Sequence, residues 1–119
     1  MNKTILITGA AKRIGKEIAL TYCELGWNII IHYNSSKKDA QELADHINSK
    51  NPNTAKIVQA NLDVDSDVER LVEESKNLFD SIDILVNNAS TFYPTPIDEI
   101  SNEHWIKLVG SNLKGPLFL

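Results

Sequence analysis

The chain has 119 residues, of which 42% are hydrophobic and 24% are charged, and its formal net charge at pH 7 is -4. This composition is that of a globular domain, and the acidic pI of about 5.3 argues against nucleic acid or an anionic membrane surface as the main partner. Cys23 is the only cysteine, which excludes a disulfide framework. The sequence contains no secretion signal and no apolar run of ~20 residues, so we expect a cytoplasmic protein. We expect no metal site.

Four short apolar runs, at residues 3–8, 28–33, 55–60 and 82–86, predict strands that are buried on both faces. Stretches with a helical period lie between them. Because strand and helix alternate, the sequence predicts an α/β fold, doubly wound, with a parallel sheet and helices on both of its faces.

The helical stretches differ in their apolar stripes. The first has the stripe Ile14, Ile18, Tyr22 and Leu25, the second Ala40, Leu43, Ala44 and Ile47, and the third Val68, Leu71, Val72, Ser75 and Phe79. Gly26 is expected to cap the C-terminus of the first helix. Ser66 and Glu69 are expected to form a capping box at the start of the third.

The segment from Thr8 to Gly15 joins the first strand to the first helix. Gly9 permits a turn that a Cβ would block, and Gly15 permits close packing of the helix on the sheet. Lys12 and Arg13 place positive charge at this turn of an acidic chain, which favours an anionic ligand near the first N–H groups of the helix. The segment therefore predicts a phosphate site, with an ordinary structural turn as the alternative.

The end of the second strand indicates which cofactor that phosphate belongs to. In dinucleotide-binding units, an acidic residue at this place binds the ribose 2′-hydroxyl of NAD. Here the strand continues into Asn34, Ser35 and Ser36, and the first acid is Asp39. Hydroxyl groups and lysines at a helix N-terminus suit a phosphate, which favours NADP. The alternative is that a serine only caps the helix and that the lysines are solvated.

The fourth strand ends in Asn87-Asn88, and the loop after it carries Phe92 and Tyr93. Ligands of such sheets bind beyond the carboxyl ends of the strands, so this loop is expected to border the site. The asparagines either satisfy backbone groups at the strand end or contact the cofactor. The aromatic residues either stack on a flat heterocycle or anchor the loop.

A last helix is expected to begin near Ser101. Its apolar stripe continues to Asn112, a polar residue that needs a hydrogen-bond partner. Pro116 lies four residues later and cannot bond to the carbonyl of Asn112. Either the helix kinks there and frees that carbonyl to hold a water of a proton relay, or Gly115-Pro116 simply ends the helix.

These residues resemble the short-chain dehydrogenase/reductase family over the whole chain, and within it the pteridine reductase branch. The family motif T-G-x-x-x-G-x-G has Arg13 in place of its middle glycine, as in pteridine reductases. The segments His32-Tyr33, Asn88-Ala89-Ser90 with Phe92, and Ser111-Asn112 are similar to that branch too. The resemblance implies a Rossmann-like fold, cut off after the fourth strand and the helix that follows it. Residues 1–119 would be the N-terminal, cofactor-binding part of a single domain.

The resemblance also implies roles for individual residues. NADPH or NADP would be held by Gly9, Lys12, Arg13, Ile14, Gly15, Tyr33, Asn34, Ser35, Ser36, Asn61, Leu62, Asn88, Ala89 and Ser90. A pterin or folate-like substrate would contact Ser90 and Phe92. Asn112 matches the asparagine of the family's catalytic Asn-Ser-Tyr-Lys tetrad, and the full-length form is expected to be a homo-oligomer.

Two departures from the family pattern limit these expectations. Asn61 stands where the family has an adenine-binding aspartate, with Asp63 as a possible substitute. The catalytic serine and the Tyr-x-x-x-Lys pair are absent; Tyr33 and Lys37 have the right spacing, but they lie at the adenosine end of the cofactor. We therefore expect a truncated enzyme that is inactive alone.

Three functions remain open from the sequence. The first is the cofactor-binding half of an NADPH-dependent pteridine reductase. The second is a non-catalytic nucleotide-binding or interaction module that uses the exposed edge of the fourth strand. The third is a reductase of a carbonyl substrate.

Overall fold

A computed structural model describes residues 2–89 of the chain. Strand and helix alternate in the order β1 (Thr4–Ile7), α1 (Arg13–Glu24), β2 (Asn28–Tyr33), α2 (Lys37–Lys50), β3 (Ala55–Gln59), α3 (Asp65–Leu78) and β4 (Ile84–Val86). The strands form one sheet in the order β3-β2-β1-β4, and every neighbouring pair is parallel. The structure confirms all four predicted strands, with ends that differ from the prediction by at most two residues.

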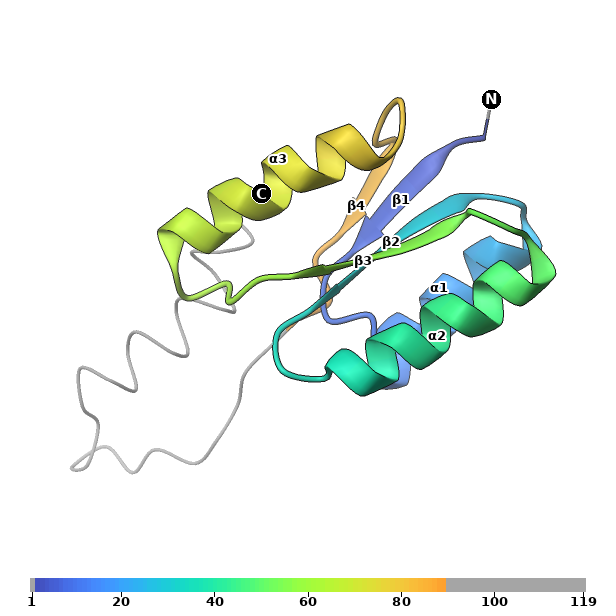
Figure 1. The fold of residues 1–119 in the computed structure, drawn as a ribbon, viewed down its shortest axis with the longest axis horizontal. Coiled ribbons are helices and arrows are strands. Elements are labelled where there is room, and N and C mark those ends of the chain that lie inside the picture. Colours follow the sequence, from blue (N-terminus) through green and yellow to red (C-terminus); the bar gives the residue numbers. More distant parts are fainter. Residues whose placement is uncertain (1, 90–119) are drawn as a thin grey trace.

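The two faces of the sheet carry different helices. Figure 1 shows α1 and α2 on one face and α3 on the other. Side chains alternate along each strand, so Ile29 and Ile31 pack in the core with α1 and α2, whereas Ile30 packs with Val68 and Leu71 of α3. This arrangement confirms the doubly wound α/β fold with a parallel sheet.

Helix α1 faces the sheet with a different stripe from the one predicted. The buried residues are the small ones, Gly15, Ala19 and Cys23, whereas Ile14 is 69% exposed and Leu25 65% exposed. Small side chains let the helix approach the sheet closely, and this packing prevails over the larger apolar residues one position away. Ile18 and Tyr22 of the predicted stripe are partly buried and pack against the core, so the prediction is wrong for Ile14 and Leu25 only.

The predicted end of α1 is confirmed. Gly26 has φ +82°, its N–H bonds to the Cys23 carbonyl at 3.0 Å, and the N–H of Trp27 bonds to the Tyr22 carbonyl at 3.1 Å. This pair of bonds is a Schellman motif, which satisfies two of the last carbonyls of the helix. The chain can then turn directly into β2.

The predicted stripe of α2 is confirmed, because Ala40, Leu43, Ala44 and Ile47 are all buried. In α3, Val68, Leu71 and Ser75 are buried as predicted. The predicted capping box is wrong: α3 starts at Asp65 after Val64, and no side chain among the described residues caps it. The nearby Asp67 carboxylate instead accepts a hydrogen bond from the N–H of Asn61 at 2.8 Å.

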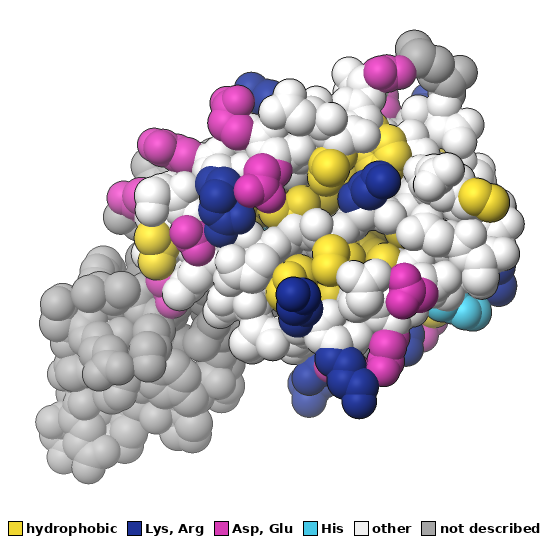
Figure 2. All heavy atoms as spheres, in the orientation of Figure 1, with side chains coloured by type: hydrophobic (Ala, Val, Ile, Leu, Met, Phe, Trp, Pro, Cys, Tyr) yellow, Lys and Arg dark blue, Asp and Glu magenta, His cyan; other side chains and the backbone are white. Residues whose placement is uncertain are grey.

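Charges of both signs are mixed on the face of the molecule that Figure 2 shows, over α3 as well as α2. Within residues 2–89, no helix is both long and apolar enough to cross a membrane. The predicted last helix, with Asn112, and the residues Ser90 and Phe92 lie outside the described residues.

Candidate functional site

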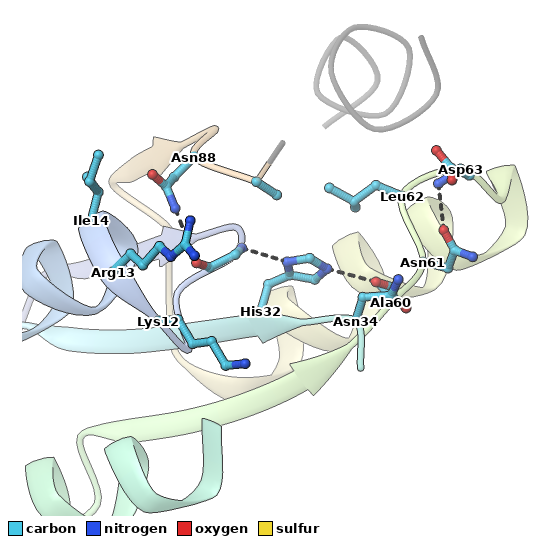
Figure 3. A pocket seen from close by; sticks show the side chains of 12 residues that line it. Lys12, Arg13, Ile14, His32, Asn34, Ala60, Asn61, Leu62, Asp63 and Asn88 are labelled. Atoms are coloured by element: carbon cyan, nitrogen blue, oxygen red, sulfur yellow. Dashed lines mark hydrogen bonds between the residues drawn. The ribbon is translucent and has the colours of Figure 1, made fainter. Parts of the chain in front are cut away.

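A pocket of about 530 Å³ lies at the carboxyl ends of the strands. Four segments line it: the β1–α1 turn, the ends of β2 and β3 with the residues that follow, and the end of β4. The lining residues are Gly9, Lys12, Arg13, Ile14, His32, Asn34, Ala60, Asn61, Leu62, Asp63, Asn88 and Ala89 (Figure 3). Ligands of doubly wound sheets bind at this edge.

Two glycines make the floor of the pocket possible. Gly9 has φ +63°, and a Cβ there would lie 2.9 Å from the Cα of Ala89. A Cβ on Gly15 would lie 2.5 Å from the carbonyl oxygen of Gly9 and 2.6 Å from Nδ2 of Asn88. Such distances are far below van der Waals contact, so the turn, α1 and the end of β4 approach one another only because both residues are glycine. Both roles predicted for these glycines are confirmed.

Arg13 and Ile14 begin α1 at the rim of the pocket. Both are exposed, and Arg13 has φ +54°, a left-handed backbone that L-residues other than glycine rarely adopt. The family motif has a glycine at this position, and the backbone explains why a glycine suits it. In Figure 3 the Arg13 side chain lies above the turn, on the side of Asn88.

Lys12 extends in a different direction, toward the N-terminus of α2. Its Nζ lies 3.4 Å from Oδ2 of Asp39, and both side chains are substantially exposed. An exposed ion pair of this kind contributes little to stability, about 0–1 kcal/mol. Lys12 can therefore exchange Asp39 for another anion at small cost.

The turn between β2 and α2 exposes the polar residues that the sequence singled out. Asn34 lines the pocket, and its carbonyl accepts a hydrogen bond from the Gln59 side chain at 3.1 Å. Ser35 is exposed, and Ser36 precedes the first residue of α2. Neither hydroxyl caps the helix among the described residues, which removes the structural role proposed as the alternative for these serines.

The end of β4 is tied to the glycine turn. Nδ2 of Asn88 donates to the Gly9 carbonyl at 3.1 Å, and the backbone N–H groups of Asn88 and Ala89 both donate to Oγ1 of Thr8 at 3.0 Å. Asn88 thus has the backbone-satisfying role that the sequence left open. It also lines the pocket, so the two roles are compatible.

The segment after β3 forms the opposite wall. Oδ1 of Asn61 accepts a hydrogen bond from the N–H of Asp63 at 2.9 Å, which closes an Asx-turn. A carbonyl oxygen has two lone pairs, so Asn61 retains the capacity to accept from an adenine amine. Leu62 is buried beside it and supplies an apolar surface.

A model of short chain dehydrogenases matches residues 3–119 of the sequence. The chain belongs to the short-chain dehydrogenase family. Curated relatives agree: it is 35% identical to 3-oxoacyl-[acyl-carrier-protein] reductase FabG of Staphylococcus epidermidis over 97% of this chain and 47% of the relative. It is 34% identical to the Staphylococcus aureus protein of the same name, over 97% of this chain and 46% of that one.

A third relative is the hydroxynaphthalene reductase-like protein Arp2 of Metarhizium brunneum, which is 34% identical over 98% of this chain and 43% of its own length. The chain thus spans slightly less than half of the relatives it matches. The match confirms the oxidoreductase family that the sequence resembled. It does not single out the pteridine reductase branch.

The structure brings most of the predicted site residues of this short-chain dehydrogenase together. Nine of them line the pocket: Gly9, Lys12, Arg13, Ile14, Asn34, Asn61, Leu62, Asn88 and Ala89. Gly15 lies against the turn, and Ser35 and Ser36 follow Asn34 in the chain but do not line the pocket. Tyr33 is 8% exposed and packs in the core on the face of α1 and α2, away from the pocket.

Sequence reasoning did not assign a role to His32, whose ring lies in the middle of the pocket lining (Figure 3). A signal was present. His32 follows three isoleucines in a strand that is buried on both faces, and a buried polar residue requires hydrogen-bond partners. His32 and Ile30 are two residues apart in the strand, so both side chains lie on the face of the sheet that α3 covers.

Proposed function

We propose that this chain is the NADPH-binding half of a short-chain oxidoreductase. The observation that carries the proposal is the pocket at the carboxyl ends of the strands, which is lined by the glycine turn, by the cations Lys12 and Arg13 and by the N-terminus of α1. The two glycines leave room for a ligand to approach the backbone of the turn. N–H groups at a helix N-terminus and a guanidinium such as that of Arg13 are groups that bind a pyrophosphate.

The choice of NADPH over NADH rests on the β2–α2 turn. A 2′-phosphate at this place would meet Lys12, which gives up only a weak ion pair with Asp39. It would also meet the hydroxyl groups of Ser35 and Ser36, which are not used to cap α2. The first turn of α2 adds the favourable end of a helix dipole. Asp39 is the acidic residue in the first turn of α2, and its pair with Lys12 would open when the phosphate binds.

Each wall of the pocket would then have a definite task. Arg13 and Ile14 would border the pyrophosphate, and Asn61 and Leu62 would hold the adenine. Asn88 and Ala89 would flank a ribose while they hold the turn in place. The bound cofactor would supply the hydride, and the residues of the pocket would bind and orient the cofactor.

The cofactor proposal is tested by isothermal titration calorimetry of the chain with NADPH and NADH. We expect NADPH to bind at least about tenfold more tightly, which corresponds to roughly 1.4 kcal/mol. Lys12→Met should weaken NADPH binding about tenfold and leave NADH binding unchanged, whereas Lys50→Met, at the far end of α2, should change neither. Equal affinity for the two cofactors would refute the 2′-phosphate assignment. A lack of binding to either would favour a non-catalytic interaction module.

For the substrate, we propose a dihydropterin or dihydrofolate. The support is Arg13 at the position of the motif's middle glycine, together with Ser90 and Phe92 in the loop after β4. A carbonyl substrate is the second candidate. It is favoured by the names of the relatives, since a 3-oxoacyl group is a ketone.

Binding to the chain saturated with NADPH distinguishes the two substrate classes. We expect dihydrobiopterin to bind, and Phe92→Ala to abolish that binding without altering the affinity for NADPH. Acetoacetyl-coenzyme A should not bind. The reverse preference would establish the carbonyl substrate.

A further inference from the structure

The ring of His32 connects two walls of the pocket. His32 is 2% exposed, and its side chain lies between the glycine turn and the end of β3 (Figure 3). Nδ1 lies 2.9 Å from the backbone N of Gly9, and Nε2 lies 2.8 Å from the carbonyl oxygen of Ala60. One side chain thus spans from the segment after β1 to the segment after β3.

These two partners determine the protonation state of the ring. The Gly9 N–H can only donate a hydrogen bond, so Nδ1 must accept and carry no proton. The Ala60 carbonyl can only accept, so Nε2 must carry the proton. The ring is therefore neutral, with its single proton on Nε2. Burial lowers the pKa of His32 from its ordinary value of 6.5, which favours the same neutral form.

His32 fixes two successive N–H groups of the turn. Its ring accepts from Gly9, and its backbone carbonyl accepts from the N–H of Ala10 at 3.1 Å. Both of these N–H groups are therefore directed at β2 and not at the pocket. The path of the turn after Ala10, which brings Lys12 and Arg13 to the rim, starts from this anchored pair.

We propose that His32 is a positioning residue for the cofactor, which holds the glycine turn in its binding conformation only while the ring is neutral. This inference rests on the proposed function, since the turn is the proposed pyrophosphate site. A protonated ring would present an N–H at Nδ1 to the N–H of Gly9. Two donors would then face each other in a buried place, so the turn would move away from the ring.

Charged residues of both signs lie on the elements around the ring. Lys12 and Arg13 lie on the turn and Asp63 follows β3, and α3 on the same side of the sheet carries Asp65, Asp67, Glu69, Arg70, Glu73, Glu74 and Lys76. Asp67 and Arg70 pair with each other at 3.6 Å. The two cations on the turn oppose a further positive charge. Because burial lowers the pKa of His32 from its ordinary value of 6.5, the ring is protonated only at a lower pH than a free histidine, and cofactor affinity should fall there.

The first experiment needs no cofactor. We expect 15N NMR of the chain at about pH 8 to show His32 with its proton on Nε2 and the Gly9 amide protected from hydrogen exchange. As the pH is lowered toward about 5, the Gly9 amide shift should follow the titration of His32. A Gly9 amide that does not respond to the titration of His32, or a ring protonated on Nδ1 at pH 8, would overturn the inference.

The second experiment measures the Kd for NADPH from about pH 8 to about pH 5 in the native chain, in His32→Gln and in His46→Gln. Glutamine can accept a hydrogen bond from the N–H of Gly9 but does not titrate. His32→Gln should therefore bind NADPH about fivefold more weakly than the native chain at pH 8, and its affinity should lack the pH dependence that comes from the His32 ring. His46 is exposed on α2, so its variant should match the native chain.

The decisive quantity is the Kd of His32→Gln divided by the Kd of the native chain. The 2′-phosphate also titrates near pH 6, but it affects native chain and variant alike and cancels in the ratio. We expect this ratio to decrease to one or below as the pH falls. A ratio that is constant over the pH range would refute the role of His32. Failure of the native chain to bind NADPH would instead refute the proposed function, and the NMR titration would still decide whether His32 positions the turn.

Discussion

Arg13 combines a strained backbone with a position at the rim of the proposed cofactor pocket. Its φ of +54° costs about 1–2 kcal/mol for a residue with a Cβ, and a glycine would avoid most of this cost. The side chain is exposed at the rim of the pocket, so burial does not repay the backbone strain. What the arginine offers in return is a guanidinium beside the proposed pyrophosphate site.

Substitution of Arg13 should therefore separate the two effects. We expect Arg13→Gly to raise the free energy of unfolding by about 1 kcal/mol, because the left-handed backbone is no longer strained. The same substitution should weaken NADPH binding about tenfold, since a charge-assisted hydrogen bond is lost. Urea denaturation and calorimetry measure the two quantities.

Arg13→Ala is the matched control, because alanine removes the guanidinium but keeps the Cβ. It should bind NADPH as weakly as Arg13→Gly and gain none of its stability. If the alanine and glycine variants were equally stable, the strain at this position would be refuted.

At the scale of elements, α3 carries a polar group that its packing does not satisfy. Ser75 is fully buried among the residues of α3 that face the sheet, and its hydroxyl has no hydrogen-bond partner among residues 2–89. An unsatisfied buried hydroxyl costs about 1–3 kcal/mol. Ser75→Ala removes that cost and also introduces a better helix former.

We expect Ser75→Ala to raise the free energy of unfolding by about 1 kcal/mol, measured by urea denaturation. Ser66→Ala in the first turn of the same helix is the control. Ser66 is exposed and caps nothing among the described residues, so its loss should change stability by less than about 0.5 kcal/mol. A destabilisation of about 1 kcal/mol by Ser66→Ala would restore the capping box.

The elements themselves could be predicted from sequence, because apolar runs and helical periods reflect burial directly. The centre of the buried face of α1 could not, since Gly15 and Ala19 are favoured there by close approach to the sheet and not by hydrophobicity. The capping box failed for a related reason: Asp67 bonds to the N–H of Asn61, and α3 begins one residue before Ser66. Local patterns predict the type of an element better than its contacts.

The pocket was predictable in outline because the ends of parallel strands meet at one edge of the sheet. That rule places Gly9, Asn34, Asn61 and Asn88 together, as the structure does. It gives no hydrogen-bond partners, which depend on the distance between neighbouring turns. The bridge made by His32 was therefore visible only in three dimensions.

At the scale of the whole molecule, the central strand β1 connects the two strands beside it. β1 lies between β2 and β4, and its end is joined to both neighbours: the N–H of Thr8 bonds to the Val86 carbonyl at 3.0 Å, and Gly9 bonds to His32. Among the described residues β4 pairs with β1 alone, so β4 forms one edge of this sheet.

Because His32 joins the segments after β1 and β3, its protonation should affect the stability of the entire sheet. Burial lowers its pKa in the folded state below the unfolded value of 6.5. Between these two values the unfolded chain binds more protons than the folded one, so stability increases with pH. The contribution of His32 is complete above about pH 6.5, is lost as the pH falls through the folded-state pKa, and changes no further below it.

Urea denaturation at several pH values measures this effect. We expect the free energy of unfolding of the native chain to decrease as the pH falls below about 6.5, and the decrease to be smaller in His32→Gln, which cannot titrate at this position. Other groups contribute equally to both proteins and cancel in the difference. His46→Gln should follow the native chain, because His46 is exposed. Parallel curves for the native chain and His32→Gln would show that the ring is protonated equally in the folded and unfolded states, and hence that the two hydrogen bonds do not depend on its neutral form.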